Sequence, residues 1–198
     1  MEPLLVETRL LAPVFDRFEA QQSISVLDLG PGQGRTVAFL QQFHVKLYCA
    51  DLASAARLVD ANAFADYEPE EQLAILRTTL TKQLGLPDGS RLDACLFWDY
   101  LHLLSPTALI ALNDVLTPHL TRHTQGYGFG ALYNNATVEQ DLFAIEDSET
   151  LAIFPEDNKP MPFTHSQQRL NESLNSFKVS RGTLLHQGRL ELLFERNA

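Results

Sequence analysis

Apolar residues form short runs and helix-like repeats along this chain, and one run ends at three closely spaced glycines. Residues 24–29 are largely apolar, and Gly30, Gly32 and Gly34 follow them. Apolar residues return at roughly helical spacing over 37–43. Because an apolar run, a glycine-rich break and a helical repeat follow one another, the sequence predicts a strand, a tight turn and a helix.

Further strands are predicted by apolar runs and by alternation. They cover 45–51, 92–98, 126–133 and a C-terminal hairpin of 178–186 and 189–195 around Gln187 and Gly188. The largely apolar run of 92–98 is typical of a strand buried on both faces. Alternating apolar residues over 190–194 indicate a strand with one exposed face.

Helix-like repeats lie between most of these strands. The first expected helix lies in residues 1–22, where apolar residues have helical spacing over 4–20. The others are a short helix after residue 53 and helices over 69–83, 105–116 and 166–177. Pro69 and Pro106 mark helix starts. Alternation of strands and helices predicts an α/β fold on a mostly parallel sheet.

The connection over 136–163 is expected to be long and irregular. It contains several acidic residues, among them Asp141, Glu146 and Glu156. Long connections of this kind in compact domains are usually functional or mobile. A substrate lid and a solvated acidic loop both remain open as interpretations.

Composition narrows the classes of function and partner. The 198 residues suit one domain over 1–198, and the net charge of −10 argues against nucleic-acid binding. No apolar run approaches the ~20 residues of a membrane span. Cys49 and Cys95 lie in strand-like runs, so we expect buried free thiols, no metal site and a reducing cytoplasm. The oligomeric state is not indicated.

The glycine turn has the properties of a ligand cradle. Glycine lacks Cβ, which permits positive φ and a close approach of a ligand to the backbone. A dinucleotide fingerprint, Gly-x-Gly-x-x-Gly, would need a glycine where Arg35 stands. A nicotinamide-dependent oxidoreductase is therefore the last-ranked of the enzymatic hypotheses.

Asp28 followed by Gly30, Gly32 and Gly34 resembles motif I of the class I S-adenosylmethionine-dependent methyltransferases. Asp51 ends the second predicted strand, where this family holds the acid that binds the ribose hydroxyls. The alternatives are a local turn cap for Asp28 and an N-cap for Asp51. The cofactor-binding residues that the resemblance implies are Asp28, Gly30, Gly32, Gly34, Asp51, Leu52, Trp98 and Asp99.

A second block of similarity follows the strand predicted over 92–98. Asp99-Tyr100-Leu101-His102 is similar to the Asp-x-Leu-His of the family, which implies that these residues lie near the bound sulfonium. His102 is a candidate base or a loop-holding residue, and Asp99 and Tyr100 are equally weak catalytic candidates. Trp98 is expected either to stack on adenine or to pack in the core.

The resemblance implies a three-layer Rossmann-like methyltransferase fold, with a seven-stranded, mostly parallel sheet that ends in an antiparallel hairpin. It also implies S-adenosylmethionine as cofactor and a small-molecule methyl acceptor. Tyr133, Asn134 and Asn135, at and after the end of the fifth predicted strand, are candidates to face that acceptor. Residues 78–83 lack the third strand and the adenine-binding acid that many relatives have. A methyltransferase-like binding module without turnover is therefore the alternative function.

Overall fold

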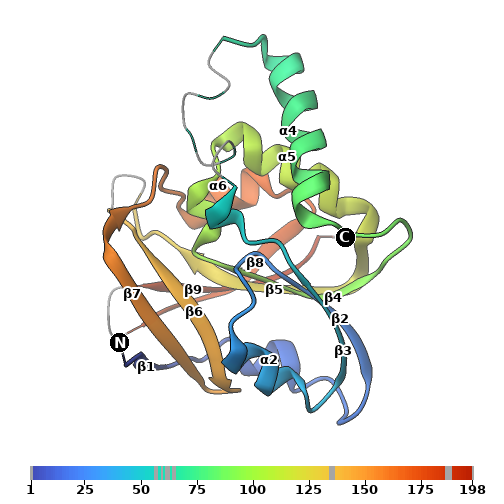
Figure 1. The fold of residues 1–198 in the computed structure, drawn as a ribbon, viewed down its shortest axis with the longest axis vertical. Coiled ribbons are helices and arrows are strands. Elements are labelled where there is room, and N and C mark those ends of the chain that lie inside the picture. The colour runs from blue at the N-terminus through green and yellow to red at the C-terminus, as the bar shows by residue number, and fades with distance from the viewer. Residues whose placement is uncertain are drawn as a thin grey trace.

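The computed structural model describes residues 2–55, 58, 60, 63, 66–133, 137–185 and 189–197, with the side chains of 157–159 left out (Figure 1). A six-stranded sheet with the order β3-β2-β4-β5-β9-β8 forms its centre. The strands are β2 (Ser23–Asp28), β3 (His44–Cys49), β4 (Leu92–Trp98), β5 (Leu120–Gly130), β8 (Phe177–Leu184) and β9 (Leu190–Arg196). The first four are parallel to one another, and β9 is antiparallel to both β5 and β8.

The strand predictions hold best at the centre of this sheet. β4 has the predicted bounds, and all of its residues except Asp93 are buried. A strand covered on both faces needs a nearly continuous apolar run, and Asp93 near its start is the one charged residue in this strand. The C-terminal hairpin is confirmed too, with β9 inserted between β5 and β8; its predicted turn at Gln187 and Gly188 lies outside the described residues, as do Asn134 and Asn135.

Helices cover both faces of the six-stranded sheet. The helices are α1 (Ala12–Phe15), α2 (Gly34–Leu40), α4 (Pro69–Leu84), α5 (Pro106–Leu116) and α6 (Gln167–Ser173). Figure 1 shows α4, α5 and α6 on one face and α2 on the other. The helix start predicted at Ser105 and Pro106 is confirmed, and Ser105 caps α5 by accepting a hydrogen bond at Oγ from the Ala108 N–H at 3.1 Å. In the described part of the chain, no helix has the length and apolarity that crossing a membrane requires.

A second, antiparallel sheet of order β1-β7-β6 corrects two expectations. Its strands are β1 (Leu4–Glu7), β6 (Glu139–Asp147) and β7 (Thr150–Pro160). The prediction of a helix over 4–20 is wrong, because β1 pairs with β7 and only the four-residue α1 follows. The irregular connection expected over 136–163 is wrong as well, because most of it forms the β6–β7 hairpin.

The expectation of one seven-stranded sheet is also wrong. Between β3 and β4 the described chain forms the short 3-10 helix η1 (Leu52–Ser54) and then α4, and it contributes no strand there. Residues 78–83 belong to α4, which begins at Pro69 as predicted. The sheet therefore has an α/β topology with six strands, four of them in a parallel block.

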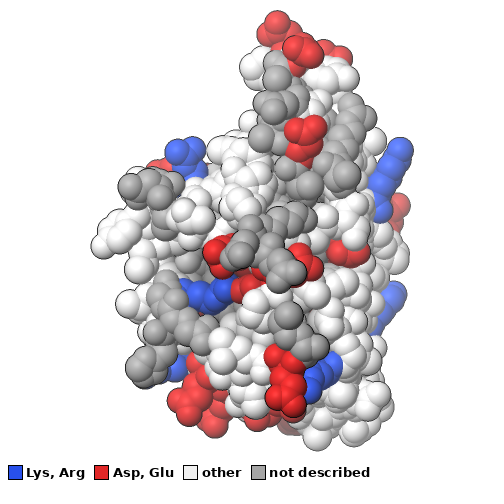
Figure 2. All heavy atoms as spheres, turned by 60° about the vertical axis from the view of Figure 1, so that its left-hand side comes forward, with Lys and Arg blue, Asp and Glu red and all other residues white. Residues whose placement is uncertain are grey.

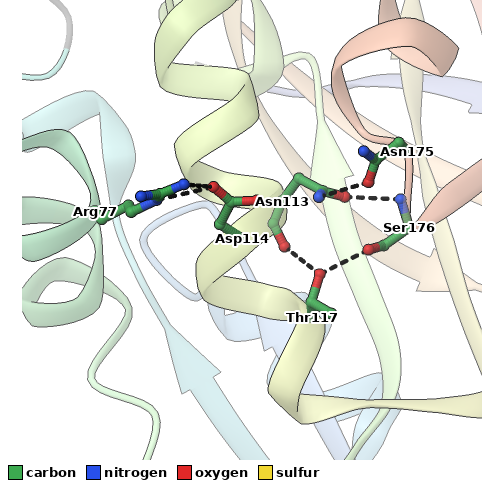
Figure 3. Close-up of polar contacts among 6 residues, drawn as sticks. All are labelled: Arg77, Asn113, Asp114, Thr117, Asn175 and Ser176. Carbon is green, nitrogen blue, oxygen red and sulfur yellow. Dashed lines mark hydrogen bonds and ion pairs between the residues drawn. The ribbon is translucent and has the colours of Figure 1, made fainter. Parts of the chain in front are cut away.

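Polar side chains on α5 make hydrogen bonds and an ion pair to the neighbouring elements of the helical layer (Figure 3). Asn113 is buried, donates from Nδ2 to Asn175 Oδ1 at 2.8 Å, and accepts the Ser176 N–H at 2.8 Å. The neighbouring Asp114 points the other way, toward Arg77 of α4, whose Nε donates to it at 2.8 Å. One turn of α5 thus holds both α4 and the segment between α6 and β8.

Candidate functional site

The loops at the carboxyl ends of β2 and β3 bring the predicted glycine turn against the predicted ribose acid. The Asp51 N–H donates to the Gly30 carbonyl at 3.1 Å, and the Leu52 N–H donates to the Leu29 carbonyl at 2.9 Å. Because β2 and β3 are parallel, both loops leave the sheet at the same edge, where α/β proteins bind ligands. Leu52 itself is fully buried and packs in the core.

Asp28, at the end of β2, is buried and ties β2 to β4. The Trp98 indole N–H and the Gly30 backbone N–H donate to its Oδ1 at 2.7 and 2.8 Å. Burial raises the pKa of Asp28 to about 6, although these two hydrogen bonds oppose the rise. The carboxyl group therefore has both a turn-holding role and an ionisation that titrates near neutral pH.

The three glycines have different surroundings. A Cβ on Gly30 would lie 2.9 Å from Tyr100 Cε2, and one on Gly32, where φ is +72°, would lie 2.5 Å from Cys49 Sγ. A Cβ on Gly34 would meet nothing within 4 Å. Gly30 and Gly32 thus make room for side chains of the protein itself, and Gly34 is the one of the three beside open space.

Asp51 follows β3 in a strained backbone conformation. Its φ of 42° lies in the left-handed region, which costs a residue other than glycine about 1–3 kcal/mol and is most common at functional sites. Its Oδ2 accepts a hydrogen bond from Ser54 Oγ at 2.5 Å, and the side chain makes no N-cap bond to η1. Gln83 of α4 holds the Asp51 backbone by donating to the Ala50 and Asp51 carbonyls.

Trp98 and Cys49, which end β4 and β3, differ in exposure. The Trp98 ring is 1% exposed, stacks on Phe143 at 5.5 Å between centroids, and meets the edge of Tyr127. It therefore has the packing role that was one of its two interpretations. Both cysteines are free thiols, but Cys49 is exposed, so the expectation that it is buried is wrong.

Tyr100 lies beside the glycine turn, where a Cβ on Gly30 would approach both its ring and Asp28 Oδ1. It belongs to the 3-10 helix η2 (Tyr100–Leu103), and its buried hydroxyl has no hydrogen-bond partner among the described residues. Burial raises its pKa far above the usual value, and the charges of Asp99, Asp28, Glu156 and Asp51 raise it further. Where these acidic groups are ionised, they give this edge of the sheet a negative potential.

A cavity of about 310 Å³ opens on the other side of η2. Its lining comes from the ends of β4 and β5, from the start of β6 and from Arg189 just before β9, and it includes Asp99, His102, Phe129, Tyr133 and Glu139. Figure 2 shows acidic side chains gathered around a hollow in this face, with basic side chains inside it. Tyr133, expected to face an acceptor, lines this cavity.

Asp99 precedes Tyr100 in the chain and lines the cavity. It is fully buried, and Arg189 Nη1 lies 3.7 Å from its Oδ2. Burial raises the pKa of Asp99 well above its usual range, and the Arg189 guanidinium opposes the rise. Arg189 also forms an ion pair with Asp141 of β6, so two carboxylates share one cation.

His102 is buried, and its hydrogen bonds fix its tautomer. Its Nδ1 accepts the His165 backbone N–H at 3.1 Å, and the two imidazole rings stack at 5.6 Å. Burial lowers the pKa of His102 to about 3, so the ring is neutral at pH 7. Because Nδ1 accepts, the proton is on Nε2. His102 in this arrangement is therefore a hydrogen-bond donor rather than a base.

Sequence reasoning missed four residues that complete the site: Arg189, Asp141, Glu156 and His165. Arg189 lies beside Asp99 and pairs with Asp141, and the His165 backbone N–H bonds His102. These contacts join elements distant in sequence, and no local spacing indicates them. One available signal was overlooked. The apolar runs 142–145 and 151–154, separated by an acidic segment, have the pattern of a hairpin. Recognising it would have placed Asp141 and Glu156 on strands.

No protein-family model and no curated protein sequence matches the chain. One similar solved structure is 1,6-didemethyltoxoflavin-N1-methyltransferase of Burkholderia thailandensis with bound 1,6-didemethyltoxoflavin and S-adenosylhomocysteine. It shows 16% identity, with coverage of 89% of this chain and 72% of that chain and a TM-score of 0.48. The glycopeptide N-methyltransferase MtfA complexed with S-adenosyl-L-methionine shows 14% identity, coverages of 94% and 92% and a TM-score of 0.49. An S-adenosylmethionine-dependent methyltransferase from Clostridium acetobutylicum shows 11% identity, with coverage of 90% of this chain and 86% of that chain and a TM-score of 0.47.

Proposed function

We propose that this chain binds S-adenosylmethionine at the carboxyl edge of β2, β3 and β4 and transfers its methyl group to a small-molecule acceptor. The observation that carries the proposal is the placement of two acidic residues on the glycine turn at this edge: the Gly30 N–H donates to Asp28 Oδ1 at 2.8 Å, and the Asp51 N–H donates to the Gly30 carbonyl at 3.1 Å. S-adenosylmethionine has a positive sulfonium and a positive ammonium group. A buried edge of the sheet with several carboxylates attracts such a ligand and disfavours an anionic one.

The residues at this edge fit the two polar ends of the cofactor. Asp51 is half-buried, and its carboxylate is suited to accept two hydrogen bonds from a vicinal ribose diol. Asp28 has a pKa of about 6, and a bound ammonium group would favour its ionised form. Asp51 would therefore hold the ribose, and Asp28 would supply charge at the amino-acid end.

Methyl transfer from a sulfonium needs little acid–base catalysis by the protein. A sulfonium is an activated methyl donor, so alignment of donor and acceptor can supply much of the rate. The neutral His102 and the buried Asp99 lie in the adjoining cavity, where their task would be to orient the acceptor. An enzyme of this kind needs no activated nucleophile among its own side chains.

Titration calorimetry with S-adenosylhomocysteine tests this proposal. We expect saturable binding, and we expect Asp51→Ala to weaken it by on the order of 2 kcal/mol, the loss of charge-assisted hydrogen bonds. Asp88→Ala, an exposed position in the turn before β4, is the matched control and should bind like the parent. Absence of saturable heat would favour a binding module without this pocket, whereas heat with NAD alone would favour an oxidoreductase.

A further inference from the structure

Two buried side chains that line the 310 Å³ cavity have unused hydrogen-bonding capacity. Among the described residues, the two carboxyl oxygens of Asp99 have no hydrogen-bond partner, and the Nε2 of His102 has none either. Both side chains line the cavity and are 0% exposed. Leaving a buried polar group without a partner costs about 1–3 kcal/mol. A ligand that supplied the missing partners would recover this free energy.

The two groups lie on one side of the same turn. The His102 N–H donates to the Asp99 carbonyl at 2.9 Å at the start of η2, three residues apart. In a 3-10 helix, side chains at this separation are nearly eclipsed. Asp99 and His102 can therefore reach neighbouring atoms on one edge of a single ligand.

Their hydrogen-bonding directions are complementary. His102 presents an N–H at Nε2, because its Nδ1 accepts the His165 N–H. A carboxyl group has at least one acceptor oxygen in either protonation state, so Asp99 presents an acceptor. The matching ligand edge carries an acceptor for His102 next to a donor for Asp99.

Charge and size narrow the ligand further. The Arg189 guanidinium is already ion-paired with Asp141, and Glu139 adds another acidic side chain to the wall, so an anion would find no unpaired cation among the described lining residues. An ammonium ion would face the His102 N–H and Arg189. The volume is at the low end for ligand sites, and Phe129 and Tyr133 are aromatic, which suits one or two rings.

We propose that this cavity is the acceptor site and that it recognises an uncharged lactam-type heterocycle, with its carbonyl oxygen on His102 Nε2–H and its ring N–H on Asp99. The proposal rests on the proposed function for the acceptor role, and it names the substrate class. It assigns His102 and Asp99 to acceptor binding and orientation.

Three matched bicyclic probes test the proposal by NMR titration of the 15N-labelled protein, with and without saturating S-adenosylhomocysteine. Quinolin-2(1H)-one carries the full donor–acceptor edge, N-methylquinolin-2-one lacks only the N–H donor, and quinoline lacks both the N–H donor and the carbonyl. We expect quinolin-2(1H)-one to bind at least about 10-fold more tightly than the other two, as one good hydrogen bond allows. Equal binding of the three, or no binding of quinolin-2(1H)-one, would overturn the proposal.

His102→Asn removes the Nε2–H, and its amide oxygen can still accept the His165 N–H. We expect this variant to lose about 10-fold in affinity for quinolin-2(1H)-one, as loss of one hydrogen bond predicts. His119→Asn, at a histidine bonded to Ser90 away from the cavity, should bind like the parent. Unchanged affinity in His102→Asn would overturn the assignment, and if that variant does not fold, the comparison of the three probes on the parent decides.

The same samples separate this proposal from the proposed function. Binding of S-adenosylhomocysteine without selectivity for quinolin-2(1H)-one removes the lactam assignment and leaves the cofactor site. Selective lactam binding without any binding of S-adenosylhomocysteine removes the methyltransferase function and, with it, the acceptor role of the cavity.

Discussion

The indole N–H of Trp98 donates a 2.7 Å hydrogen bond to Asp28 Oδ1, which joins the ends of two adjacent parallel strands. Both side chains are nearly inaccessible to solvent. The bond places the residue that ends β4 against the residue that begins the glycine turn. Trp98 thereby positions Asp28, and the ionisation of Asp28 becomes part of the folding equilibrium.

We predict that Asp28 makes the protein less stable as the pH rises from about 4 to about 7. Its pKa is raised in the folded state from 3.8 to about 6, so between these values the unfolded chain has lost the proton that the folded chain keeps. The stabilisation is complete below the unfolded pKa and is lost as the pH rises through the folded pKa. A shift of about 2 units corresponds to roughly 3 kcal/mol.

Urea unfolding of the parent and of Asp28→Asn between pH 4 and pH 7 measures this effect. Asparagine keeps an oxygen for Trp98 and Gly30 but cannot ionise, so the parent's free energy of unfolding relative to the variant should fall by about 3 kcal/mol across the range. Asp88→Asn, at an exposed turn, should run parallel to the parent. A constant difference between the parent and Asp28→Asn would show that Asp28 titrates normally.

Gly32→Ala should destabilise the protein by about 3 kcal/mol. Part of this cost is the strain of a side chain at positive φ, and part is the steric clash of the new Cβ with Cys49. The added Cβ would lie 2.5 Å from Cys49 Sγ. In a Cys49→Ala background the cost should fall to about 1.5 kcal/mol, because the backbone strain alone remains. Gly34→Ala, beside open space at the start of α2, should be neutral or stabilising by up to about 1 kcal/mol. Chemical denaturation of the four variants decides, and equal costs in both backgrounds would refute the contact.

Asn113→Ala should cost about 2–3 kcal/mol, because it leaves the buried Ser176 N–H without its acceptor and removes the bond to Asn175. Asp114→Ala, one residue along α5, should cost less than about 1 kcal/mol, since its ion pair with Arg77 is partly exposed. Thermal and urea unfolding compare the two. Similar losses would mean that the network of Figure 3 does not anchor the helical layer as its geometry indicates.

The sequence predicts the parts of this fold whose signals are local. Apolar continuity identified β4, Ser105 and Pro106 identified the start of α5, and alternation identified β9. The first 22 residues failed because apolar spacing there resembled a helix, whereas Val6 and its neighbours form an edge strand whose partner, β7, lies about 145 residues away. A pairing so distant leaves no periodic trace in either segment alone.

The candidate site divides in the same way. Glycine spacing and strand-end acids located Asp28, Gly30 and Asp51, because turns and strand ends have sequence signatures. The tautomer of His102 and the shared cation of Asp99 could not be predicted, because each depends on a partner from another element, His165 and Arg189. Long-range hydrogen bonds decide what these two side chains can do, and the folded structure alone supplies them.

Two tyrosines with opposite hydrogen bonding give the last test. The Tyr100 hydroxyl is buried without a partner in the described structure, whereas the Tyr127 hydroxyl donates to the buried Glu191 at 2.7 Å. Tyr100→Phe should therefore stabilise the protein by about 1 kcal/mol, and Tyr127→Phe should destabilise it by about 1–2 kcal/mol. Urea unfolding of both variants measures the contrast.

The cofactor adds a second readout at Tyr100. If S-adenosylhomocysteine binds among the carboxylates around this residue, its ammonium group lies in the potential that Asp28, Asp51 and Asp99 create, and removal of the neutral hydroxyl leaves that potential in place. Tyr100→Phe should then gain stability, and its affinity for S-adenosylhomocysteine should stay within about 3-fold of the parent's, a smaller change than the loss of one hydrogen bond would cause. A loss of more than about 10-fold would mean that the hydroxyl itself bonds the cofactor, so that its lack of a protein partner reflects a contact reserved for the ligand.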